Sequence, residues 1–134
     1  MTTQEILEAA RAAKTAVALS DGTTRNAALC GMADALGAPE HLDAILSANA
    51  EDMAAAKGKI SDVMLDRLAL TPQRIAAMAK GIRDVAALPD PVGRVLNRVE
   101  RPNGLVIEKT AVPMGVIAII YESRPNAVSY THLT

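Results

Sequence analysis

Residues 112–126 read VPMGVIAIIYESRPN, and this stretch decides which fold the chain takes. Its centre, residues 115–121, is apolar with no polar alternation, which is typical of a strand buried on both faces of a parallel sheet. A parallel neighbour requires a crossover of about a dozen residues, usually a helix, and then another strand. The chain has 134 residues, so only 13 follow Tyr121. We therefore expect an α/β layer that begins here and is not completed within this sequence.

The stretch before it predicts a β-hairpin. β-branched residues dominate from Val92 onward, and Pro102-Asn103-Gly104 lies as a turn between Val95–Arg101 and Leu105–Val112. The second arm alternates only loosely, so the pattern does not fix its register. Two prolines within residues 88–93 prevent any helix from continuing into this region.

Helices are predicted upstream of the hairpin, because apolar residues recur there at helical spacing. The predicted starts are the capping box of Thr2 with Glu5, then Thr23 or Thr24, Pro39, Ser61, and Thr71 followed by Pro72. We expect the first helix to run to about Leu19 and the second to end at Gly37. The region from Ala38 to Gly58 is expected to be one long amphipathic element.

Composition excludes several classes of protein. The chain has 14 Lys and Arg against 15 Asp and Glu, so its net charge of -1 predicts neither a nucleic-acid nor a membrane-surface partner. Charged residues interrupt Met1–Leu19, which argues against a signal peptide or membrane span, and the default location is the cytoplasm. A single cysteine fits a reducing compartment. His41 and His132 lie too far apart for a local ligand pair, so no metal site is predicted.

Several stretches resemble the gamma-glutamyl phosphate reductase family, also called glutamate-5-semialdehyde dehydrogenase, of the aldehyde dehydrogenase superfamily. Residues 112–126 resemble its signature. The stretches that resemble the family upstream, in the same order, are Ala48-Asn49 with Asp52, Asp66-Arg67-Leu68, Arg74-Ile75, residues 85–93 and Arg101–Leu105. The resemblance covers roughly Met1 to Asn126.

The resemblance implies an α/β, aldehyde dehydrogenase-like fold. An N-terminal helical region would occupy residues 1–91, and a β-hairpin that contributes to oligomerisation would occupy residues 92–112. Residues 113–126 would start a truncated, Rossmann-like NADP-binding domain. By resemblance the parent enzyme is a homo-oligomer.

The resemblance also implies an oxidoreductase of proline biosynthesis. Such an enzyme uses NADPH to reduce gamma-glutamyl phosphate to glutamate 5-semialdehyde and phosphate. A cysteine thiolate displaces the phosphate and forms a thioester with the acyl group. Hydride then reduces this thioester. That cysteine lies far downstream in the family, and Cys30, which stands in the second helix among alanines, is interpreted as a packed residue. We therefore expect an N-terminal fragment that is inactive alone.

The candidate site residues stand in the loop after the apolar strand. Asn126 follows the strand's C-terminal end, where open α/β sheets place ligands, and the resemblance implies that its amide donates to the oxyanion. A simple turn-forming asparagine is the alternative. Arg124 has the fork of donors that suits a substrate carboxylate or phosphate, although it equally suits solvent or a pair with Glu122. The residues implied to line the cofactor are Tyr121, Glu122, Ser123 and Pro125.

The last residues depart from the family. Val128–Thr134 resembles one reading frame of the transposon-end adapter used to prepare sequencing libraries, so we expect residues 127–134 to be a non-native tail. Two other interpretations stay open. The first is another member of the superfamily, although residues 121–125 replace its usual short proline-tryptophan loop. The second is a non-enzymatic helical interaction module, which would leave the apolar run 116–121 on an exposed edge.

Overall fold

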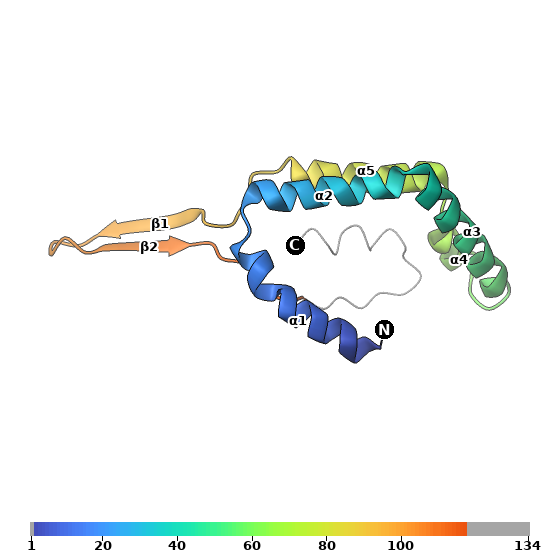
Figure 1. Ribbon diagram of the computed structural model, residues 1–134, viewed down its shortest axis with the longest axis horizontal. Coiled ribbons are helices and arrows are strands. Elements are labelled where there is room, and N and C mark those ends of the chain that lie inside the picture. The colour runs from blue at the N-terminus through green and yellow to red at the C-terminus, as the bar shows by residue number, and fades with distance from the viewer. Residues whose placement is uncertain (1, 118–134) are drawn as a thin grey trace. The chain divides into compact units, whose positions relative to one another are not determined.

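The computed structural model describes residues 2–117, which form five helices and a two-stranded antiparallel sheet (Figure 1). They divide into two compact units. One unit holds residues 2–25 and 88–117, and the other is Asn26–Ala87. Within the described part, no helix combines the length and the apolar character needed to cross a membrane.

Helix α1 (Thr3–Leu19) begins at the predicted capping box. The Thr2 hydroxyl accepts the backbone N–H of Glu5 at 3.3 Å, and the Glu5 carboxylate accepts the backbone N–H of Thr2 at 2.6 Å. Two N–H groups that the helix leaves unpaired are thus satisfied within four residues. At the other end the chain turns at Ser20, whose backbone N–H donates to Val17 at 3.2 Å.

Helix α2 (Gly22–Gly37) begins two or three residues earlier than a cap at Thr23 or Thr24 predicts. Its capping side chain is Asp21, whose carboxylate accepts the N–H of Thr24 at 2.7 Å. The prediction that Thr23 or Thr24 caps this helix was wrong. Aspartate is at least as good a helix cap as threonine. Asp21 stands three residues before Thr24, whose N–H its carboxylate reaches.

The unit Asn26–Ala87 is built around helices that pack on one another. It contains most of α2 together with α3 (Pro39–Ala56), α4 (Asp62–Leu68) and α5 (Pro72–Ala86). As predicted, Ser61 and Thr71 cap α4 and α5 by accepting backbone N–H groups. Helices α2 and α5 lie side by side (Figure 1). Their shared core consists of Ala33, Ala79 and Ile82, with Leu29 and Leu36 packed against it.

A buried amide fixes the connection between α4 and α5. Asn49 of α3 is only 8% exposed. Its side-chain amide donates to the carbonyl of Leu68 at 3.0 Å and accepts the N–H of Leu70 at 2.7 Å. Both halves of the side chain are therefore paired, which is what burial of a polar group requires.

Strands β1 (Val95–Glu100) and β2 (Val106–Thr110) form the predicted hairpin. Arg98 pairs with Glu108 in the register, and a bulge separates Val95 from Asn97. Gly104 closes the turn with φ +83°, a conformation that residues with a Cβ rarely adopt. All residues of both strands are exposed in the unit.

The strand expected over residues 115–121 is not observed in the residues that can be compared. Residues 115–117 are not in a strand, and Val116 and Ile117 are 49% and 43% exposed. Residues 118–121 lie outside the described residues. A strand requires a hydrogen-bonded neighbour, and the described part provides none for this segment.

Candidate functional site

All the site residues predicted from sequence lie outside the described residues. These are Tyr121, Glu122, Ser123, Arg124, Pro125 and Asn126. Their roles stay predictions. The described structure contains the chain that leads to them, from the base of the hairpin to Ile117, and the polar cluster that holds that base.

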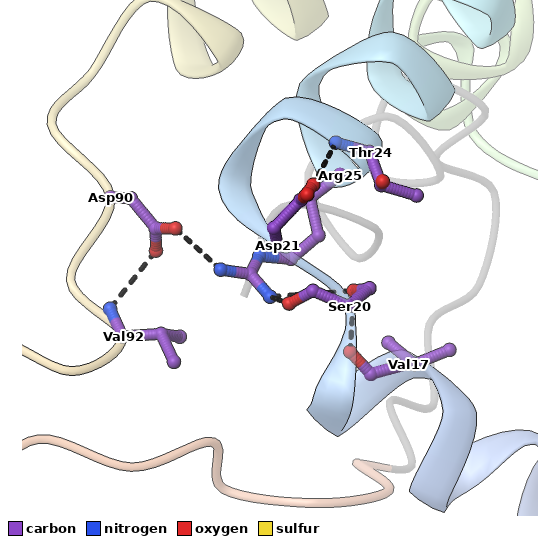
Figure 2. A network of polar contacts seen from close by, with 7 residues as sticks. All are labelled: Val17, Ser20, Asp21, Thr24, Arg25, Asp90 and Val92. Carbon is purple, nitrogen blue, oxygen red and sulfur yellow. Dashed lines mark hydrogen bonds and ion pairs between the residues drawn. The ribbon is translucent and has the colours of Figure 1, made fainter.

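The polar cluster centres on Arg25, in the first turns of α2 (Figure 2). Its guanidinium donates to the backbone carbonyl of Ser20, at the end of α1, and to the Asp90 carboxylate. The second carboxylate oxygen of Asp90 accepts the backbone N–H of Val92 at 2.9 Å. One guanidinium thus joins the end of α1 to the loop that leads into the hairpin.

Both carboxylates of this cluster are held ionised. The N–H of Val92 and then the Arg25 guanidinium lower the pKa of Asp90. The backbone N–H of Thr24, followed by the Thr24 side chain, lowers the pKa of Asp21. Hydrogen bonds to the charged form favour that form. At neutral pH these carboxylates accept hydrogen bonds and hold no proton to donate, so the cluster suits fixing the backbone better than acid catalysis.

The Asp90 carboxylate lies directly against the backbone of Gly22. A Cβ built on Gly22 would lie 2.7 Å from the Asp90 carboxylate oxygen, closer than atoms can approach without displacement. Gly22 is therefore the residue that lets the loop approach the start of α2. The sequence does not predict this cluster, because Arg25 and Asp90 are 65 residues apart and no local pattern links them.

The base of the hairpin continues the ladder beyond the strands. Gly93 donates its N–H to the carbonyl of Ala111 at 2.9 Å, and Ala111 donates to Arg94 at 2.9 Å. Beyond Ala111 the chain runs to Gly115, which has φ +98°. A Cβ on Gly115 would lie 3.3 Å from the Cε atom of Lys14, so the glycine permits a close approach to α1.

No candidate metal centre emerges from the described part. Residues 2–117 contain no group of three or more His, Cys, Asp or Glu side chains that could hold a metal ion. Cys30 is exposed, so its prediction as a packed residue was wrong. It follows Leu29 directly and therefore lies off the stripe that faces α5. His41 is exposed as well.

Several known proteins that are similar to this chain carry the same name. Gamma-glutamyl phosphate reductases from Streptococcus pneumoniae strains Hungary19A-6 and JJA are 58% identical to it over 126 residues. The match covers 94% of this chain and 30% of those proteins. This chain is similar to a part of these gamma-glutamyl phosphate reductases. The resemblance read from residues 112–126 and from the upstream stretches is thereby confirmed.

Solved structures agree with the sequence match. The crystal structure of gamma-glutamyl phosphate reductase from Thermotoga maritima gives a TM-score of 0.91 at 36% identity, covering 97% of this chain and 31% of that one. The enzyme of the same name from Saccharomyces cerevisiae gives 0.88 at 34% identity, covering 99% of this chain and 34% of that one. The helices and the hairpin match the N-terminal part of these structures. No family model matches the chain.

The match covers only part of each related protein. The chain spans about a third of the length of these gamma-glutamyl phosphate reductases. The matched part comprises the helical region and the hairpin.

Proposed function

We propose that this chain supplies the helical region, the hairpin and the first site loop of an enzyme of proline biosynthesis. The enzyme reduces gamma-glutamyl phosphate to glutamate 5-semialdehyde with NADPH and releases phosphate. The observation that carries the proposal is the 58% identity over 126 residues to gamma-glutamyl phosphate reductases. The catalytic cysteine that forms the acyl-enzyme is assigned to sequence beyond this chain.

Residues 121–126 are assigned the first contacts with substrate and cofactor. In this assignment the Asn126 amide donates to the oxyanion, and the Arg124 guanidinium binds the substrate carboxylate or phosphate. Tyr121, Glu122, Ser123 and Pro125 line the cofactor. The donor set suits this work, because a planar cationic fork and a neutral amide match a phosphate and a developing oxyanion. NADPH, when bound, supplies the hydride.

The hairpin is assigned to an interface between copies of the enzyme. Its exposed apolar residues lie on both faces, since Val99 and Ile107 are paired in the register and Val106 points to the opposite face. Isolated two-stranded hairpins are marginal in water, so an arm of this kind gains from a partner surface. This supports a homo-oligomeric parent enzyme.

A chimeric enzyme tests the proposal. Residues 1–126 of this chain are joined to the remainder of the Streptococcus pneumoniae enzyme, and NADPH oxidation is measured with gamma-glutamyl phosphate. The expected result is reductase activity. Absence of turnover from a chimera that folds and assembles like the parent Streptococcus enzyme would refute the proposed function.

The same chimera tests the role of Asn126. Asn126→Ala is expected to lower kcat by about 10²–10³-fold, the usual effect of removing an oxyanion donor, with little change in KM. Asn26→Ala, at an exposed position of α2, is the matched control and is expected to leave kcat unchanged. Equal kcat for the two variants would show that Asn126 is only a turn former.

A further inference from the structure

We propose that Arg25 and Asp90 are positioning residues. Their ion pair fixes the base of the hairpin to the first turn of α2, and so fixes where the segment from Ala111 to Ile117 begins. The consequence for catalysis rests on the proposed function, because that segment leads to the assigned site loop. The positioning itself rests on contacts within one unit of the structure.

The Asp90 carboxylate is held through both of its oxygens. One oxygen meets the Arg25 guanidinium, and the other accepts the N–H of Val92 at 2.9 Å (Figure 2). The absence of a Cβ on Gly22 gives the carboxylate its place beside α2. With both oxygens engaged and one side against the backbone, the carboxylate joins α2 to the loop in a defined geometry.

Backbone hydrogen bonds connect the Asp90 loop to the chain that leaves the hairpin at Ala111. Val92 is followed by Gly93 and Arg94, and these two residues form the hydrogen bonds to Ala111, both at 2.9 Å. The position of Ala111 is therefore tied to Asp90 through a short stretch of backbone. The strand ladder itself fixes β1 on β2 but not the hairpin on α2, so the ion pair supplies a separate constraint.

The chain that follows Ala111 also lies close to α1. Gly115 approaches the Lys14 side chain closely. The same Arg25 guanidinium that holds Asp90 also holds the carbonyl of Ser20 at the end of α1. The Arg25–Asp90 pair thus holds the segment at its base, and along its course the segment approaches α1, whose end Arg25 also holds.

The Arg25–Asp90 pair also differs from the other ion pairs in its exposure. Its side chains are 24% and 35% exposed, whereas those of Arg83 and Asp34 are 50% and 71% exposed. Ion pairs between well-exposed side chains contribute little to stability because water and salt screen them. The Arg83–Asp34 pair joins residues 49 apart in sequence and lies in the other unit, which makes it a matched control.

The test measures amide hydrogen exchange in the complete 134-residue chain. Asp90→Asn and Arg25→Gln each remove one charge of the pair and are expected to speed exchange of the Gly93 and Ala111 amides at least tenfold. Arg25→Lys keeps the charge and is expected to retain most of the protection. Asp34→Asn, the control, is expected to leave these two amides unchanged.

Two results would overturn the positioning role. One is unchanged exchange at Gly93 and Ala111 in both Asp90→Asn and Arg25→Gln. The other is an equal rise at these amides and at Leu70, in the other unit, which would indicate general loosening. In the chimera, Asp90→Asn is expected to lower kcat about tenfold with KM unchanged. Loss of protection in the chain without any loss of kcat would refute the catalytic consequence alone, and an inactive parent chimera would refute only the proposed function.

Discussion

Replacement of Asn49 by alanine gives the sharpest test of how the helical unit is held together. The Asn49 amide pairs with Leu68 and Leu70 on either side of the turn between α4 and α5, at 3.0 and 2.7 Å. Alanine removes both hydrogen bonds and leaves a carbonyl and an N–H of that turn without a protein partner. The turn then loses its attachment to α3.

The magnitude follows from the two bonds and from helix propensity. Each intramolecular hydrogen bond contributes about 1 kcal/mol net, so the two together account for about 2 kcal/mol. Alanine is the better helix former by up to about 0.7 kcal/mol, which offsets part of this loss. We therefore expect Asn49→Ala to lower the free energy of unfolding by about 1.5 kcal/mol, which is roughly a tenfold change in the equilibrium constant.

Urea unfolding followed by circular dichroism measures this difference, and exchange of the Leu70 amide reports it locally. Asn26→Ala is the control, because Asn26 is exposed in α2 and its replacement isolates the gain in helix propensity. We expect the control to be as stable as the parent chain or slightly more so. If Asn49→Ala matched the control in stability and in Leu70 exchange, the bridging role of Asn49 would be refuted.

Three further predictions concern the core, the turn and acid. Ile82→Ala, at a position 1% exposed, is expected to cost about 3 kcal/mol in urea unfolding through lost burial and a cavity, and Ile6→Ala, at 52% exposure, less than about 1 kcal/mol. Gly104→Ala is expected to destabilise the hairpin by about 1–2 kcal/mol, seen as faster exchange of its ladder amides, because its φ is positive. The pKa of Asp90 is lowered below its ordinary value of 3.8, so its contribution to stability is fully present above pH 3.8 and is lost as the pH falls further. Acid titration followed by circular dichroism is expected to show a smaller loss below that pH in Asp90→Asn, and an unchanged acid response would contradict the assignment.

Features decided within a few residues were predictable from the sequence. The capping box of Thr2 with Glu5, the caps at Ser61 and Thr71, and the turn at Gly104 all depend on neighbours three or four positions away. The start of α2 was missed because three residues within four positions, Asp21, Thr23 and Thr24, can each cap a helix, and spacing alone does not choose among them.

Features that depend on distant partners were not predictable in this way. In the sequence, Asn49 is only one residue of a stretch that resembles the family. The fold shows that its side chain binds the turn between α4 and α5. The Arg25–Asp90 pair joins two segments that periodicity treats separately. Cys30 was expected to pack, but its exposure follows from the direction of the helix face.

The candidate site residues were predicted from the family resemblance, whereas the helices and the hairpin were predicted from local sequence patterns. The position of Asn126 after the apolar run drew attention to this loop, and the family signature supplied the roles of residues 121–126. The structure contributes the path to that loop, from the hairpin base at Ala111 along the chain to Ile117.

The small size of the helical core has a thermal consequence. In residues 2–117 the buried apolar residues are Ala33, Ile75, Ala79 and Ile82, two of which are alanines. The heat capacity increment of unfolding grows with the apolar surface newly exposed to water. Leu19 and Val112 are already 82% and 76% exposed in the folded chain and add little to that increment. The unfolding enthalpy of this part therefore changes only slowly with temperature, and its stability curve is broad and flat.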